Sequence, residues 1–176
     1  DAERERDVER FRRCIRAAER LDCRRIRVYA GSFLPSEEAL REAKWTRLVT
    51  SLKHLGGIAE RAGVVLCVEN HFNTMTVTAA ETVALMKAVN ATGVGILYDQ
   101  ANLTFTHSEP HQEAIPLQQA WIRHVHVKDL IFTDPHRKFT ASAVATVEEE
   151  ARAVRSRLVG EGILDWAAIV RQLWTY

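Results

Sequence analysis

Four short apolar segments recur along the chain at intervals of roughly 30 residues, and a stretch of helical periodicity separates each from the next. The segments are 25–30, 64–68, 93–98 and 122–127. The second is a continuous apolar run, which is typical of a parallel strand buried on both faces. Strands that alternate with helices predict βαβ units around a parallel sheet, so we expect an α/β protein.

The helical stretches carry recognisable signals. Helices are expected over 5–21, from the loop at 31–35 to about residue 62, over 109–120 and over 146–158, with a loop at 134–135. Thr78 and Glu81 form a capping-box pattern, and Asp165 is expected to cap a last helix. The adjacent Gly56 and Gly57 are a weak point at which a kink or break is expected to be tolerated.

Two architectures fit this alternation, an open doubly wound sheet and a closed (βα)8 TIM barrel. No glycine-rich GxGxxG turn follows the early strand, which removes the simplest support for a dinucleotide-binding sheet. Four strands cannot close a barrel of eight. We therefore expect residues 1–176 to be a single partial TIM-barrel domain, truncated at both ends, from which the first two strands and the last strand are absent.

Composition narrows the kind of partner. The chain is 47% hydrophobic and 27% charged with a net charge of +1, so neither nucleic acid nor a membrane is expected as its partner. No apolar run approaches the roughly 20 residues that span a bilayer. Cys14, Cys23 and Cys67 form no CxxC pair, which is typical of reduced thiols in a cytoplasmic protein. A small-molecule partner is expected, and a homo-oligomer is compatible with the sequence.

Three good metal ligands stand at equivalent places in the pattern. Glu69, Asp99 and His126 each lie at the C-terminal end of a separate expected strand, the rim at which barrels carry their active sites. Each alone could be an ordinary polar group at a strand end. Burying two carboxylates without a cation is costly, however, and this set suits Mn²⁺, Mg²⁺, Co²⁺ or Zn²⁺. We expect one divalent metal ion on all three.

The last of these strands carries two histidines. Period-2 alternation puts His124, His126 and Lys128 on one face of the strand and Asp129 on the other. His126 is nearer the rim and is the better ligand candidate. His124 is expected to be a packed or hydrogen-bonded interior histidine.

Four motifs give these residues a family context. They are VENH at 68–71, LYDQAN at 97–102, HVHVKD at 124–129 and GEGILDW at 160–166. In this order and spacing they resemble the xylose-isomerase-like TIM-barrel superfamily. That group includes sugar phosphate isomerases and epimerases, ketose 3-epimerases, inosose and dehydroshikimate dehydratases, and the AP endonuclease family 2 (endonuclease IV) type of repair nuclease. The resemblance covers about residues 24–174.

The resemblance implies roles for individual residues. Glu69 would be both a metal ligand and a catalytic acid or base, and Asp99 and His126 would be ligands. The family's fourth ligand, a glutamate on the last strand, would lie beyond Tyr176. Glu161 belongs to the loop before the last helix in the family pattern, and its GEG sequence is expected to form a tight turn.

Two departures from the family pattern limit the function. Ketose epimerases have a histidine where this chain has Asn102, which argues against an epimerase of that type. The repair nucleases carry an Asp-x-His pair before the GEG element, and residues 155–159 offer none, which argues against a trinuclear nuclease site.

We therefore expect a divalent-metal-dependent isomerase or epimerase of a sugar, sugar phosphate or polyol. Glu69, or the glutamate beyond Tyr176, would remove a proton next to a metal-polarised carbonyl. Loss of hydroxide after that step would instead give a dehydratase of the inosose or dehydroshikimate type. His71 and Asn102 are expected either to bind substrate hydroxyls or to orient a ligand. A different class of interpretation is a catalytically incomplete barrel that acts as a binding or interaction module.

Overall fold

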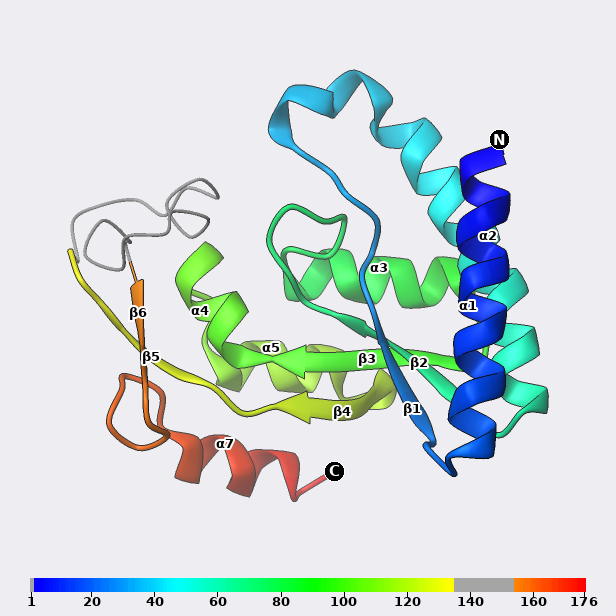
Figure 1. Cartoon of the computed structure of the whole chain (residues 1–176). Coiled ribbons are helices and arrows are strands. Elements are labelled where there is room, and N and C mark those ends of the chain that lie inside the picture. The colour runs from blue at the N-terminus through cyan, green and yellow to red at the C-terminus, as the bar shows by residue number, and fades with distance from the viewer. Residues whose placement is uncertain (1, 135–153) are drawn as a thin grey trace.

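The computed structural model describes residues 2–134 and 154–176 (Figure 1). Its helices are α1 (Ala2–Arg20), α2 (Arg41–Arg61), α3 (Ala79–Val89), α4 (Gln100–His107), α5 (His111–Gln118) and α7 (Trp166–Leu173), with short 3-10 turns η1 (Pro35–Leu40) and η2 (Gln119–Trp121). Its strands are β1 (Arg25–Val28), β2 (Val65–Glu69), β3 (Val94–Asp99), β4 (Ile122–His126), β5 (Asp129–Phe132) and β6 (Val154–Arg157).

The first four strands form one parallel sheet in the order β1-β2-β3-β4. Spatial order follows chain order without the reversal that defines a doubly wound sheet, which confirms the partial-barrel prediction. Arg25 Nε on β1 donates a hydrogen bond to the Arg123 backbone oxygen on β4 at 2.6 Å. A side chain can reach across two intervening strands in this way only if the sheet is curved. The four strands of this sheet are half of a barrel of eight, so the sheet is not a closed barrel.

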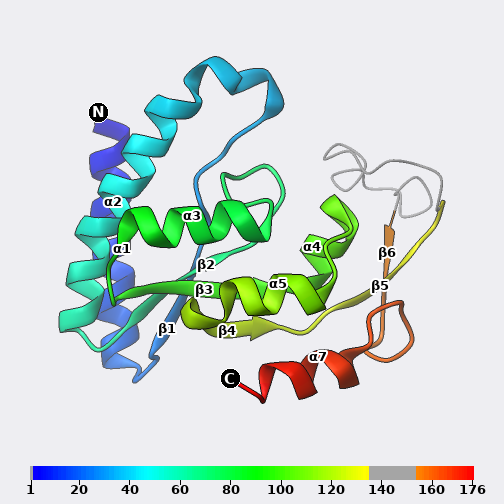
Figure 2. The same cartoon turned by 180° about the vertical axis from the view of Figure 1, so that it is seen from behind.

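Helices cover one face of this sheet. Helix α1 contacts α2, α2 contacts α3, α3 contacts α5, and α5 contacts α7. The two opposite views show α3 and α5 lying along the same side of the strands (Figures 1 and 2). Alternate strand residues such as Leu66, Val68 and Ile96 are fully buried beneath them. Each such side chain contributes about 1.5–3 kcal/mol on burial. The other face carries polar residues, among them Arg27, Glu69 and Asp99.

Helix α2 runs unbroken through the Gly56-Gly57 pair, so the helix has no kink or break at the place where the sequence allowed one. The reason is close packing against the start of β3. A Cβ at Gly56 would lie 2.7 Å from Val94 Cγ2, and a Cβ at Gly93 would overlap the backbone oxygen of Gly56. Both glycines therefore let the α2 and β3 backbones approach one another.

The expected caps are present. Thr78 accepts a hydrogen bond from the Glu81 amide while the Glu81 carboxylate accepts from the Thr78 amide, and Asp165 accepts from the Ala168 amide at 2.9 Å. Helix α4 was not predicted. Asp99 caps it by accepting a hydrogen bond from the Asn102 amide, so the last residue of β3 also begins the next helix.

Two sequence predictions are wrong. A helix was expected over 146–158; residues 146–153 lie outside the described part of the chain, but Val154–Arg157 form strand β6, antiparallel to β5. Pairing with β5 overrides the local helical pattern there. His124 was expected in the interior, yet it is exposed, because it lies on the sheet face that the helices do not cover. Residue 135 of the expected loop at 134–135 also lies outside the described residues.

Candidate metal centre

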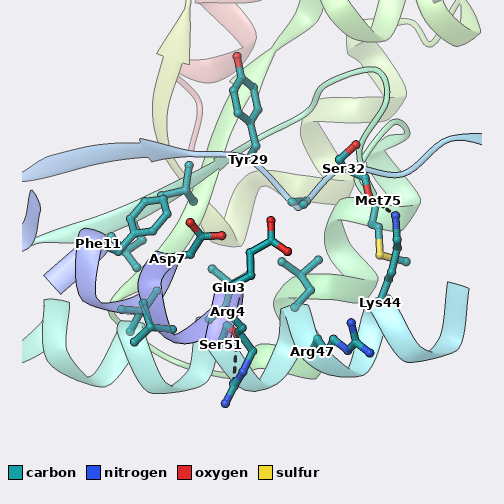
Figure 3. A pocket seen from close by; sticks show the side chains of 18 residues that line it. Glu3, Arg4, Asp7, Phe11, Tyr29, Ser32, Lys44, Arg47, Ser51 and Met75 are labelled. Atoms are coloured by element: carbon teal, nitrogen blue, oxygen red, sulfur yellow. Dashed lines mark hydrogen bonds between the residues drawn. The ribbon is translucent and has the colours of Figure 1, made fainter. Parts of the chain in front are cut away.

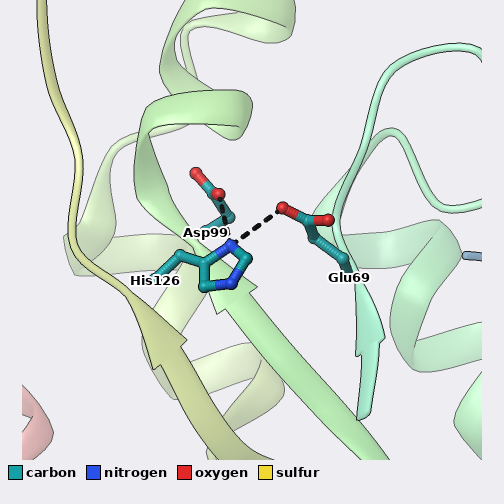
Figure 4. Close-up of side chains that lie close together, drawn as sticks. All are labelled: Glu69, Asp99 and His126. Carbon is teal, nitrogen blue, oxygen red and sulfur yellow. Dashed lines mark hydrogen bonds and ion pairs between the residues drawn. The ribbon is translucent and has the colours of Figure 1, made fainter. Parts of the chain in front are cut away.

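Three neighbouring parallel strands bring the predicted ligands together. Glu69, Asp99 and His126 are the last residues of β2, β3 and β4, and Asp99 is paired in register with His126. Parallel strands end at the same edge of a sheet, so their terminal side chains converge. One ligand atom from each residue lies within 4.8 Å of the other two (Figure 4).

The geometry suits a metal ion. His126 Nδ1 faces both acids, 3.0 Å from Glu69 Oε1 and 3.3 Å from Asp99 Oδ2. Both carboxylates are 0% exposed, whereas the His126 side chain is 26% exposed. Two carboxylate oxygens and one imidazole nitrogen, with no cysteine among them, are a donor set for Mn²⁺, Mg²⁺, Co²⁺ or Zn²⁺.

Two cations accompany the acids. Lys128 Nζ lies 2.5 Å from Asp99 Oδ2 and 3.5 Å from Glu69 Oε1. Arg27 donates to Glu69 Oε2 from Nε at 2.6 Å and from Nη2 at 2.5 Å. Their positive charges offset the two buried negative charges, which makes burial of both acids tolerable.

The two carboxyl groups differ in acidity. Burial raises the pKa of Asp99, and the Lys128 ammonium opposes this without overcoming it. Burial also acts to raise the pKa of Glu69, but the Arg27 hydrogen bonds and the Lys128 charge outweigh it and the pKa is lowered. Glu69 is therefore the more readily ionised of the pair.

Asn102 donates hydrogen bonds to both acids. Its backbone amide donates to Asp99 Oδ1 at 3.0 Å, and its side-chain amide donates to the Asn70 carbonyl at 2.7 Å and to Glu69 Oε1 at 3.4 Å. Thr76 Oγ1 donates to the Glu69 carbonyl at 2.9 Å. These hydrogen bonds hold the backbone that carries Glu69, and they place Asn102 beside both acids.

His71 lies two residues past the end of β2. Its Nδ1 is 2.8 Å from the Phe72 carbonyl, and its ring centroid is 4.7 Å from that of Tyr29 and 4.1 Å from that of Phe72. The His71 ring thus packs against two aromatic rings, those of Tyr29 and Phe72. The substrate-binding role expected for His71 stays a prediction.

Asp129 organises the loop that contains the GEG sequence. Its carboxylate accepts hydrogen bonds from the backbone amides of Leu130, Gly160, Gly162 and Leu164, at 2.9 to 3.2 Å. A Cβ at Gly162 would overlap this carboxylate. The Glu161 amide donates to the Leu158 carbonyl at 2.9 Å, so the GEG segment is a tight turn, as expected.

A separate cavity of about 620 Å³ lies between α1, α2 and the segment after β1 (Figure 3). Val28 and Leu66 line it, and both belong to the helix-covered face of the sheet, opposite to Glu69. Glu3 and Asp7 point into the cavity, whereas Tyr29 points away from it. This cavity is therefore not part of the metal centre.

Two residues of the site were missed from the sequence. Arginines alternate with apolar residues along β1, which puts Arg27 on the face opposite to Ile26 and Val28, and that alternation was the available signal. Asp129 was recognised only as part of a motif, and three of its four partners lie 31 to 35 residues away in the chain. No local pattern reports such a contact.

Comparison with known proteins identifies the family. The xylose isomerase-like TIM barrel family matches residues 1–175, and the chain belongs to it. Inosose dehydratase 1 of Bacillus cereus is 34% identical over 92 residues, which are 51% of this chain and 30% of that protein. The chain thus matches less than a third of that relative's length.

Solved structures share the fold. A probable 3-DHS dehydratase, AsbF, from Bacillus anthracis has a TM-score of 0.78 at 19% identity, over 97% of this chain and 61% of its own. A xylose isomerase-like TIM barrel protein from Mycobacterium smegmatis in complex with magnesium has a TM-score of 0.72 at 20% identity, over 99% and 58%. A D-tagatose 3-epimerase-like protein has a TM-score of 0.73 at 19% identity, over 98% and 59%.

Within residues 2–134 and 154–176, none of the helices combines the length and the apolar character that crossing a membrane requires.

Proposed function

We propose that the full-length protein is a divalent-metal-dependent enzyme that removes a proton next to the carbonyl of a polyhydroxylated ketone and then expels water, as a dehydratase does. One observation carries the proposal. Three ligand side chains from three adjacent strands meet within 4.8 Å, two of them fully buried acids, at the barrel edge where substrates bind.

Glu69, Asp99 and His126 would hold the metal, and their oxygen and nitrogen donors fit it. When bound, the metal would act as a Lewis acid on the substrate carbonyl and make the neighbouring C–H more acidic. The similar structure from Mycobacterium smegmatis is in complex with magnesium, which supports the choice of a divalent cation. The choice among Mn²⁺, Mg²⁺, Co²⁺ and Zn²⁺ is left to experiment.

Glu69 is the catalytic residue in this proposal. Its lowered pKa keeps it ionised and able to accept a proton at neutral pH. Glu69 Oε1 faces His126, so the substrate proton would be accepted by Oε2. One of the two Arg27 hydrogen bonds to Oε2 would break when that oxygen is protonated. The proton would then leave Oε2 for the departing hydroxyl, because Arg27 favours the ionised carboxylate.

Dehydration is favoured over reprotonation for two reasons. Curated relatives that are 32 to 34% identical over about half of this chain are named inosose dehydratases. Lys128 also places an ammonium group, 43% exposed, beside both acids, where it can assist the departure of a hydroxyl. A cyclic keto-polyol is therefore our proposed substrate class, and His71 and Asn102 are proposed as residues that orient its hydroxyls or the ligands.

An isomerase or epimerase, the function first predicted from the sequence, shares the same first step. Returning the proton to carbon instead of expelling hydroxide would give that outcome. The D-tagatose 3-epimerase-like protein has the same fold, which supports this alternative. The two functions differ in product, so one experiment separates them.

The test is NMR in D₂O on the Mn²⁺-loaded full-length protein with an inosose, D-tagatose and D-fructose, alongside Glu69→Gln. Deuterium uptake next to the carbonyl with loss of water from the inosose supports dehydration. Deuterium uptake together with formation of an epimeric or isomeric sugar would contradict dehydration and support the isomerase or epimerase function. A metal-loaded protein that exchanges no proton in any of the three would contradict both.

A further inference from the structure

Arg27 contacts the metal centre from a strand that contributes none of its ligands. It lies on β1, next to β2, and its side chain extends over the inner face of the sheet to Glu69, 42 residues away in sequence. Arg25, two residues earlier, shares that face but donates to the Arg123 carbonyl at the other end of β4. Two arginines of one short strand thus have separate partners.

The contact with Glu69 is one-sided. Arg27 Nε and Nη2 both donate to the same oxygen, Oε2, at 2.6 and 2.5 Å. The other oxygen, Oε1, has a different set of neighbours: His126 Nδ1 at 3.0 Å, Asn102 Nδ2 at 3.4 Å and Lys128 Nζ at 3.5 Å. The two oxygens of one carboxylate therefore face two different environments.

The Arg27 guanidinium is itself held in place. It lies over the Tyr29 ring, 4.5 Å from the centroid, and Nη2 donates to the Tyr29 hydroxyl. Stacking on an aromatic face fixes the plane of a guanidinium, and its rigid fork then fixes the carboxylate that it binds. A lysine at this position would keep the charge without the fork.

We propose that Arg27 is a positioning residue that holds Glu69 Oε2 and thereby turns Oε1 toward the metal. The inference rests on the proposed metal site and adds to it a residue outside the ligand set. Partners that orient a ligand typically change metal affinity by about 10- to 100-fold when they are removed. Arg27 therefore sets the affinity of the site without touching the metal.

The test is Mn²⁺ calorimetry on the full-length wild-type protein and on Arg27→Met, Arg27→Lys and Arg25→Met. Arg25→Met is the matched control, since it removes an equal charge from the same face of β1. We expect Arg27→Met to weaken Mn²⁺ binding by about tenfold or more and Arg25→Met to change it by less than about twofold. Arg27→Lys should fall between them, and millimolar guanidinium ion should restore binding to Arg27→Met but not to Arg25→Met.

Other results would overturn the inference. Wild-type affinity in Arg27→Met excludes a positioning role, and equal weakening in Arg25→Met would assign the effect to a general disturbance of β1. If Arg27→Met does not fold, the Mn²⁺ affinities of Arg27→Lys and Arg25→Lys are compared instead. The inference then requires weaker binding in Arg27→Lys than in Arg25→Lys. A wild-type protein that binds no Mn²⁺ would contradict the proposed function as well, whereas wild-type binding with an unaffected Arg27→Met would contradict this inference alone.

Discussion

His126 Nδ1 lies 3.0 Å from Glu69 Oε1 although 57 residues separate the two in sequence. They come from β4 and β2, with β3 and its terminal Asp99 between them. The contact exists because three consecutive parallel strands end at the same edge of the sheet. Both the proposed metal centre and its chemistry depend on that alignment.

Removing His126 or Asp99 as a donor should weaken metal binding without unfolding the protein. We expect His126→Ala and Asp99→Asn each to lower Mn²⁺ affinity at least about tenfold, because each removes or neutralises one of three ligands. Calorimetry measures the affinity, and circular dichroism checks the fold. His124→Ala is the matched control, since His124 is exposed and its ring centroid lies 6.0 Å from that of His126 on the same strand. Unchanged binding in both ligand variants would refute the site assignment.

Lys128 should compete with the metal. Its ammonium contacts the same two oxygens, Asp99 Oδ2 and Glu69 Oε1, that His126 Nδ1 approaches. Replacing it in Lys128→Met removes a like charge next to a dication, so Mn²⁺ affinity should rise by about threefold or more. Chelator competition measures the change, with Lys53→Met as a control. A weaker site in Lys128→Met would show instead that this lysine helps to build it.

Asp129 should be a large contributor to stability. Four backbone amides donate to its carboxylate, and an asparagine would present an NH₂ group to two of them. Asp129→Asn is therefore expected to lower the free energy of unfolding by about 3 kcal/mol. Asp165→Asn is the control, because a single oxygen suffices to cap the helix through the Ala168 amide. Urea unfolding compares them, and equal stability losses would contradict the account.

Asp129 also predicts a pH dependence. Burial acts to raise its pKa, but the four amide hydrogen bonds outweigh burial and the folded-state pKa is lowered. A carboxyl whose pKa is lowered on folding stabilises the protein above its unfolded pKa, and that contribution is lost as the pH falls through the folded value. The stability gap between wild type and Asp129→Asn should therefore narrow under acid conditions. Urea unfolding across a series of pH values, with a gap that stays constant, would contradict this.

Adjacent glycines in α2 should respond in opposite ways to alanine. A Cβ at Gly56 meets Val94 Cγ2 at 2.7 Å, so Gly56→Ala should destabilise the protein by about 1–3 kcal/mol. A Cβ at Gly57 meets only Arg61 Nη1 at 3.7 Å, so Gly57→Ala should stabilise the helix by about 0.5–1 kcal/mol. Thermal unfolding of both variants measures the difference. Equal shifts of the same sign would exclude the close approach of α2 to β3.

The sequence predicted the parts of the fold that follow from local periodicity. Glu69, Asp99 and His126 could be found because each ends a strand, and a parallel sheet aligns strand ends. Helix α4 was missed because Asp99 was considered only as a ligand and not also as a cap.

Other features depend on partners that are distant in sequence. Strand β6 forms against β5, so its conformation is set by pairing rather than by its own residues. Arg27 reaches Glu69 only because β1 and β2 are neighbours in the sheet, and three of the four amides that donate to Asp129 lie more than 30 residues away in sequence. Such contacts require the folded arrangement of the elements, which periodicity does not supply.

The most direct test of the central claim is Mn²⁺ binding by calorimetry to the full-length wild-type protein and to Glu69→Gln. One ion per chain in the wild type, bound at least about tenfold more weakly by the variant, is the predicted result. Absence of Mn²⁺ binding in the wild type, or equal affinity in the variant, would contradict it and favour a binding or interaction module built on the same strands.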